Sequence, residues 1–102
     1  MKYVKFLLAF ALFVFISCGK KTDVVTSGVY LGTVDEVERD KKEIYVKISD
    51  GKLLELFFTE TTSLTRDGMP AVFDQLKKGQ KVEVEVITEG KRLDPISVKI
   101  LE

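Results

Sequence analysis

Few side chains in this sequence could do chemistry. Among 102 residues there is one cysteine, Cys18, and there is no histidine. A serine or threonine nucleophile needs a neighbouring base, so without histidine Ser63 and Thr65 are better interpreted as strand or turn residues. If Cys18 serves another purpose, the rest of the chain has no thiol for a disulfide, a metal site or covalent catalysis. We therefore predict no catalytic residues and no enzyme activity.

Carboxylates are the remaining candidates, and they are densest between residues 35 and 43. Two facing carboxylates could hydrolyse a glycoside, but this chemistry needs a cleft with two walls, which so small a chain hardly provides. Oxygen ligands suit Ca²⁺, yet the D-x-D-x-D-G spacing is missing and the acids fall on both faces of a predicted strand. A solvated hairpin is the favoured interpretation, with no metal and no cofactor. The acidic residues are Asp35, Glu36, Glu38, Asp40 and Glu43.

Two features could form a binding surface instead. The loop 66–70 combines a long cation, a thioether and a rigid proline, although turn chemistry is the favoured explanation. Tyr45 and Phe57, and Ile87 further on, occupy strand positions whose side chains should face water. As cross-strand neighbours the two rings would form a patch typical of interfaces, but packing between strands explains them equally well. The candidate surface consists of Tyr45, Phe57, Arg66 and Met69.

Length and charge limit the choice of function. The chain has room for one domain with one small core. Sixteen acidic residues balance sixteen basic ones, of which Lys2 and Lys5 precede residue 18. The remainder holds 14 basic and 16 acidic residues, a net charge of −2. Such a charge attracts neither nucleic acid nor an anionic lipid surface from a distance, so we predict no nucleic-acid partner.

The first residues have the pattern of a secretion signal. A short basic segment, residues 1–5, precedes an unbroken run of eleven apolar residues, 6–16. A transmembrane helix needs about 20 apolar residues, so this run is too short to span a bilayer, whereas its length suits a signal peptide. Directly after it, the sequence Phe15-Ile16-Ser17-Cys18-Gly19 resembles the lipobox of bacterial lipoproteins.

The lipobox resemblance implies that the sulfur of Cys18 receives a diacylglycerol, that the chain is cleaved before Cys18 and that the new amine is acylated. Several acyl chains together hold a protein stably on a membrane. The chain then divides into a signal peptide (1–17), the lipidated cysteine with a flexible tether (18–27) and a domain (28–102) in the cell envelope, outside the cytosol. Gly19 slightly favours the outer membrane over the inner one, because aspartate at this place retains lipoproteins at the inner membrane in some bacteria. Ordinary secretion with cleavage after Gly19 is the alternative.

From Gly28 onward, alternating β-branched and charged residues predict strands. The first strand, 29–38, contains Gly32, where we expect a bulge or sharp coil. Pro70 is placed to open a short helix that ends before Gly79. Five or six strands with one short helix predict an all-β, OB-like barrel, because closure removes exposed strand edges. The other expected strands cover residues 44–48, 54–58, 82–86 and 96–100.

The domain resembles a family of small bacterial envelope domains of unknown function. The shared features are a Gly-x-Val-x-x-Val strand at residues 32–37, an Asp-Gly hairpin, a threonine-rich segment at 62–68 and Leu-x-x-Gly-x-x-Val-x-Val at 76–84. The last pattern is also similar to that of the periplasmic copper and silver chaperones, which are OB barrels. Those proteins hold Cu(I) with histidine, methionine and a tryptophan face, and soft ions require such donors. This chain has no histidine or tryptophan and only Met69 after the signal, which argues against a metallochaperone of that kind.

These observations favour a lipid-anchored, non-catalytic binding or structural module of the cell envelope. Its partners would be the membrane, through lipid on Cys18, and an envelope protein or glycan. The alternative is a small-molecule or ion-binding accessory subunit of an envelope transporter, which would use the loop around Arg66.

Overall fold

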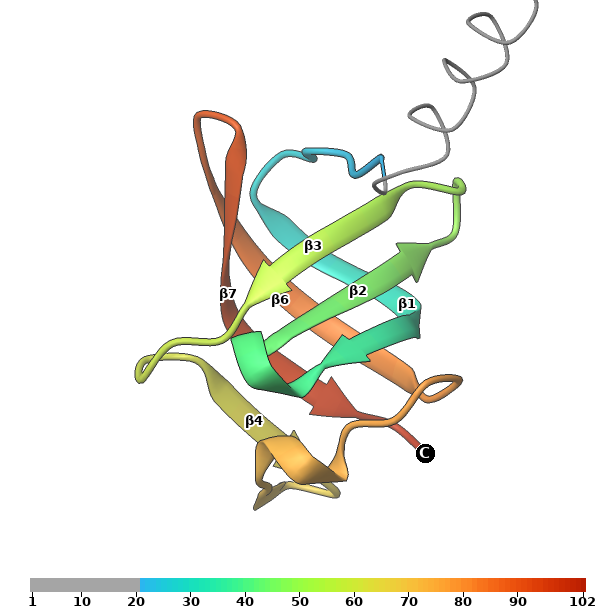
Figure 1. The fold of residues 1–102 in the computed structure, drawn as a ribbon, viewed down its shortest axis with the longest axis vertical. Helices are drawn as coiled ribbons and strands as arrows, with labels where there is room; N and C mark the ends of the chain where they lie inside the picture. Colours follow the sequence, from blue (N-terminus) through green and yellow to red (C-terminus); the bar gives the residue numbers. More distant parts are fainter. Residues whose placement is uncertain (1–20) are drawn as a thin grey trace, which may run out of the picture.

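The computed structural model describes residues 21–102, so the signal segment and Cys18 lie outside the described residues. The described chain forms one seven-stranded sheet in the order β3-β2-β1-β6-β7-β4-β5, curled into a small barrel (Figure 1). Two single turns of 3-10 helix interrupt it. The elements are β1 (Gly28–Glu38), η1 (Arg39–Lys41), β2 (Glu43–Ile48), β3 (Leu53–Phe57), β4 (Ser63–Arg66), β5 (Met69–Pro70), η2 (Phe73–Gln75), β6 (Lys81–Glu89) and β7 (Arg92–Ile100).

Strand β1 makes the barrel by pairing on both sides. Residues 28–33 pair with β6, and residues 32–38 pair with β2. Strand β3 comes next to β7, so the sheet curls back on itself. The order β3-β2-β1-β6-β7 is that of an OB-like barrel, and the all-β fold predicted from the sequence is confirmed.

Gly32 is the point where β1 bends from one partner strand to the other. A Cβ atom placed there would lie 2.6 Å from the carbonyl oxygen of Lys47 and 2.7 Å from a methyl group of Val46. Only glycine allows this approach. The bulge expected at Gly32 is found three residues later, where the register with β2 shifts between Val34 and Glu36.

The barrel is filled by aliphatic side chains, as the alternating pattern requires. Val25 adds one side chain from the segment before β1. The fully or nearly fully buried residues are Val25, Val34, Ile44, Val46, Ile48, Leu54, Leu56, Leu76, Val82, Val84, Val86, Leu93, Val98 and Ile100.

Two expectations about local structure are wrong. Pro70 opens no helix: it lies in β5 opposite Thr65, and only the 3-10 turn Phe73–Gln75 follows. The cause is the turn at Asp67 and Gly68, which both have positive φ angles and reverse the chain into a hairpin.

Strand β7 also differs from the expected pattern. Ile96, expected in the core, is 37% exposed. The register with β6 shifts between Ser97 and Pro95, so Ile96 stands opposite no residue of β6. Leu93 and Pro95 are buried instead.

The end of the expected tether is bound to the barrel. The backbone N–H of Asp23 donates to the carbonyl of Leu53 (2.8 Å), and its carboxylate accepts from the N–H of Leu53 (2.9 Å). Ser27 accepts a hydrogen bond from the N–H of Thr88 (2.8 Å), and the hydroxyl of Thr88 donates to the carbonyl of Val25. These contacts pair polar backbone groups while Val25 enters the core, so the folded part extends back to Asp23. In the stretch 21–102, no helix has the length and apolar character needed to cross a bilayer.

The close approach at Gly32 leads to a stability prediction. Gly32→Ala forces a methyl group against the backbone of β2 and is expected to lower the free energy of unfolding by about 1–3 kcal/mol. Gly28→Ala is the matched control on the same strand, because its nearest neighbour is a Tyr30 ring atom at 3.8 Å. Urea unfolding of both variants measures the difference. Equal losses in the two variants would show that the approach at Gly32 is not a constraint.

Candidate functional site

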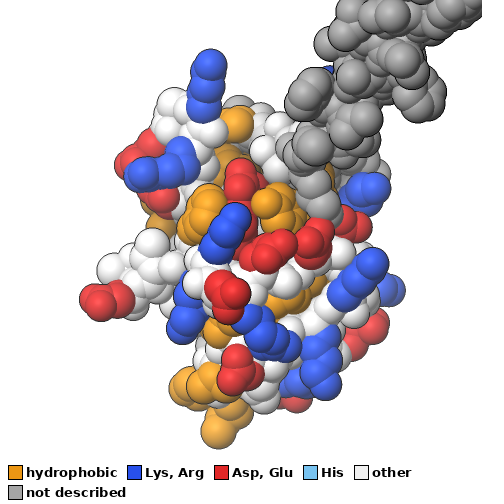
Figure 2. Space-filling model, in the orientation of Figure 1, with side chains coloured by type: hydrophobic (Ala, Val, Ile, Leu, Met, Phe, Trp, Pro, Cys, Tyr) orange, Lys and Arg blue, Asp and Glu red, His pale blue; other side chains and the backbone are white. Residues whose placement is uncertain are grey.

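The first candidate surface is the outer face of β1, β2 and β3, where acidic side chains gather over β2 and β3 (Figure 2). The strand register sets this arrangement. Tyr45 stands between Glu36 on β1 and Glu55 on β3, while Glu43 stands between Glu38 and Phe57. Two aromatic side chains therefore lie among four carboxylates on this face.

Glu43 is the unusual member of this face. Its side chain is on the outer phase of β2, yet the residue is only 1% exposed, and its Oε2 atom has no hydrogen-bond partner within residues 21–102. The pKa of Glu43 is raised from 4.5 to about 7. Burial is the largest cause, followed by a hydrogen bond with Glu55 and the charge of Glu55, against smaller opposing effects of Tyr45 and Lys41. The sequence placed Glu43 in a solvated acidic hairpin, and for this residue the expectation is wrong, because nothing in its outward strand position indicates burial.

Tyr45 belongs to the same network. Burial, followed by the charges of Glu43 and Glu55, raises the pKa of Tyr45 to about 12, and its hydroxyl hydrogen-bonds with Glu43. The structure places Tyr45 and Phe57 on neighbouring strands but diagonally, since Tyr45 faces Glu55 and Phe57 faces Glu43. Carboxylates separate the two rings, so the pair is part of a mixed acidic face.

The second candidate surface is the end of the barrel formed by β4, β5 and η2. Arg66 and Met69 face each other across the β4–β5 hairpin, whereas Tyr45 and Phe57 lie on β2 and β3. The four predicted surface residues thus lie in two separate groups. Met69 is 66% exposed and Val72 is 65% exposed, and apolar side chains cover this lower end of the molecule in Figure 2.

A recess of about 410 Å³ opens beside this hairpin. The rings of Phe58 and Phe73 meet edge to face in it, with centroids 5.0 Å apart, and the Lys42 ammonium lies 5.8 Å from the Phe73 ring centre. The recess is lined by Lys42, Phe58, Thr59, Glu60, Thr62, Leu64, Ala71 and Phe73. Sequence reasoning found Met69 but missed the recess, because its walls come from three separate segments of the chain.

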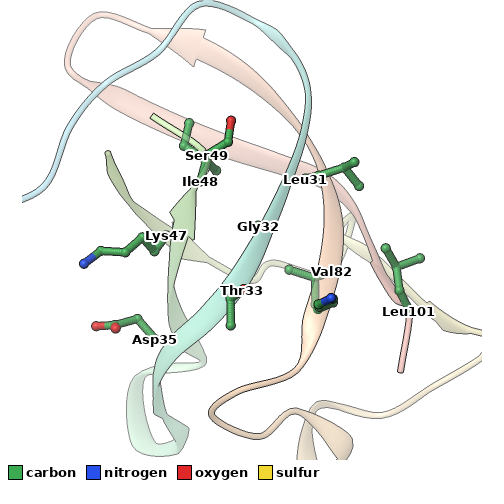
Figure 3. A pocket seen from close by; sticks show the side chains of 10 residues that line it. Leu31, Gly32, Thr33, Asp35, Lys47, Ile48, Ser49, Val82 and Leu101 are labelled. Atoms are coloured by element: carbon green, nitrogen blue, oxygen red, sulfur yellow. The ribbon is translucent and has the colours of Figure 1, made fainter. Parts of the chain in front are cut away.

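The third candidate surface is a groove of about 480 Å³ along β1, shown in Figure 3. Leu31 and Leu101 lie on one side of the groove, and Lys47 and Asp35 lie on the other. The backbone of Gly32 lies between the two sides. The remaining lining residues are Thr33, Ile48, Ser49, Lys81 and Val82.

None of the three surfaces has a clear donor set for a metal. Within residues 21–102, no group of three or more His, Cys, Asp or Glu side chains is arranged to hold a metal ion. The whole chain has no histidine, and Met69 is its one methionine besides Met1.

Comparison with known proteins gives the fold. No protein-family model matches the chain, and no curated protein matches its sequence. The structure resembles solved structures of CusF. A tryptophan-to-alanine CusF variant with Cu(II) from Escherichia coli superposes with a TM-score of 0.59 at 14% identity, covering 83% of this chain and 100% of that one.

Two further CusF structures give the same result. Ag(I)CusF has a TM-score of 0.57 at 15% identity and covers 72% of this chain and 95% of that one. Apo-CusF from Escherichia coli has a TM-score of 0.54 at 15% identity, covering 84% and 98%. At such identities the likeness shows the fold alone, and this chain is therefore a small OB-like β-barrel.

The buried Glu43 leads to a prediction about pH. Its folded pKa lies above its unfolded value, so the neutral form stabilises the fold fully below about pH 4.5, and this contribution is lost as the pH rises to about 7. This one group changes the free energy of unfolding by at most about 1.4 kcal/mol per pH unit. Glu43→Gln removes the titrating group, so the free energy of unfolding should fall less between pH 5 and pH 8 than in the parent.

Urea titrations at pH 5, 6, 7 and 8 test this expectation. Glu85→Gln, a change of an exposed carboxylate on β6, is the control and should keep the parental pH dependence. If Glu43→Gln and the parent lose the same stability over this range, another group causes the dependence.

Proposed function

We propose that this protein is a non-catalytic binding module of the bacterial cell envelope, held on a membrane by lipid on Cys18. The observation that carries the proposal is the position of the two ends of the barrel. The chain enters the fold at one end, where Asp23 binds β3, while the β4–β5 hairpin lies at the other (Figure 1). A lipid anchor before Asp23 would leave the hairpin end accessible to a partner.

The chemistry of the hairpin end favours a protein partner over a glycan. Met69 and Val72, three residues apart in sequence, expose flexible and branched apolar surface, which suits an apolar segment of another protein. Sugars stack on open aromatic faces, whereas Phe58 and Phe73 are half-buried and pack against each other. Lys42 beside this pair would favour a partner that carries an acidic group near its apolar residues.

Lipidation is tested first. Cys18→Ser removes the sulfur that would carry the diacylglycerol, so the variant should lose incorporation of radiolabelled palmitate and move from the membrane fraction to the soluble one. Ser17→Ala, which keeps a small residue before the cysteine, is the control and should remain lipidated. Membrane association and palmitate labelling that persist in Cys18→Ser would contradict the anchor.

Partner binding is tested by affinity capture from detergent-solubilised envelope with the lipidated protein. Met69→Ser/Val72→Ser should reduce capture of a specific partner by roughly tenfold or more, because central apolar contacts dominate binding energy. Ile87→Ser, which removes an exposed apolar side chain from β6, is the matched control and should leave capture unchanged. Equal capture by all three proteins would show that the hairpin end is not the binding surface.

A second candidate function is binding of an ion or small molecule as an accessory subunit of a transporter. The likeness to CusF structures solved with Cu(II) and Ag(I) favours it. The donors differ, however, because soft ions prefer imidazole, thiolate and thioether groups, and Met69 alone offers a thioether here. Thermal unfolding with Ag(I) and Cu(II) separates the two functions, since a ligand bound only by the folded state raises the melting temperature.

A further inference from the structure

The groove along β1 has an exposed apolar side that the fold does not use. Leu31 is 61% exposed and Leu101 is 50% exposed. Val29, two residues before Leu31 and on the same face of the strand, is 58% exposed. Together they place three large apolar side chains on one flank of a small barrel. The opposite side of the groove carries Lys47, whose ammonium can extend outward beyond the apolar floor.

The Lys47 side of the groove lies close to the place where the chain enters the fold. Lys47 on β2 is the direct cross-strand partner of Leu53 on β3, and Leu53 holds Asp23 through two hydrogen bonds. Two strand spacings of about 4.8 Å each therefore separate Asp23 from the wall of the groove, about 10 Å in all. Ser49, in the turn after β2, lines the groove at the same end.

The length of chain between the proposed anchor and Asp23 is short. Cys18 and Asp23 are five residues apart in the sequence, and five extended residues reach at most about 18 Å. A bilayer that held lipid on Cys18 would therefore lie within a few nanometres of the groove at all times. The domain needs no long-range charge attraction to find this surface, so its net negative charge is no obstacle.

We infer that the β1 groove is the membrane-facing surface of the domain and that it docks on the phospholipid bilayer that holds the anchor. Val29, Leu31 and Leu101 enter the boundary between headgroups and acyl chains, as the apolar faces of peripheral membrane proteins do. Lys47 and Lys81 lie at the height of the headgroup phosphates. Lys81 also lies 3.9 Å from Glu102, a contact between exposed groups that is weak in water. The inference rests on the proposed lipid anchor at Cys18.

The experiment uses the full lipidated protein in vesicles of phosphatidylethanolamine and phosphatidylglycerol. Because lipid occupies the Cys18 sulfur, one introduced cysteine is the only free thiol and takes a nitroxide label. Ser49→Cys places the label at the groove. Glu60→Cys is the matched control in the exposed loop between β3 and β4, which projects from the other side of the barrel (Figure 1). Collision rates with oxygen, which concentrates in the bilayer, and with a water-soluble nickel chelate give the depth of each label.

We expect the ratio of oxygen to nickel accessibility to be at least about three times higher at position 49 than at position 60. Leu31→Ser/Leu101→Ser in the Ser49→Cys protein should reduce this ratio to the value at position 60. Both leucines are exposed, so circular dichroism should show an unchanged fold.

The contrary outcomes are distinguishable. Equal ratios at positions 49 and 60 in protein that floats with the vesicles would overturn the docking surface and leave the anchor intact. Protein that does not float with the vesicles would overturn the anchor and this inference together. Protection of position 49 from the nickel chelate without a gain in oxygen collisions would mean that another protein copy covers the groove, which also overturns membrane docking.

Discussion

The close approach of β1 to β2 at Gly32 is the constraint on which the rest of the structure depends. One strand must serve two neighbours, β6 with its first half and β2 with its second, and the change takes place where Gly32 lies against the backbone of Lys47. A flat strand would pair on both sides along its whole length and leave the sheet open, with unpaired edges exposed. The bend lets the sheet curl, bring β3 next to β7 and enclose the aliphatic core.

A surface groove lies at the same bend. It runs along β1 where the strand passes from β6 to β2, with the exposed Leu31 on one side and Lys47 on the other. Val25, from the segment before β1, adds its side chain to the core. Binding of that segment through Asp23 fixes where the chain enters the domain, so the fold itself determines which faces lie near the entering chain and which lie far from it.

The sequence predicted the barrel because its signals are local and repeated. Alternation along residues 44–48 and 82–86 and the Asp50-Gly51 turn each depend on a few neighbouring residues, and each is found in the structure. The errors concern places where distant strands decide the outcome. Pro70 has a good helix-opening position, but the turn at Asp67 and Gly68 pairs it with Thr65 on β4, and β4 is itself held by its pairing with β7. Ile96 fits the alternation of its own strand, but the register with β6 shifts beside it. The sequence of one strand does not indicate such a shift.

The candidate surfaces were harder to predict than the fold, for a physical reason. The burial of Glu43 depends on side chains from β1 and β3 that meet it only in the closed sheet, so its sequence neighbours give no sign of it. The recess at Phe58 and Phe73 likewise needs two segments fifteen residues apart to come together.

The likeness to CusF at 14–15% identity illustrates how fold and surface are specified by different residues. A barrel of this kind is specified by turn glycines and apolar alternation, which leaves every outward position free to change. The residues that specify the barrel and the residues on its outer faces are different ones, so a shared barrel constrains the chemistry of the outer faces very little. The function of this chain therefore depends on the side chains that its own strands bring together.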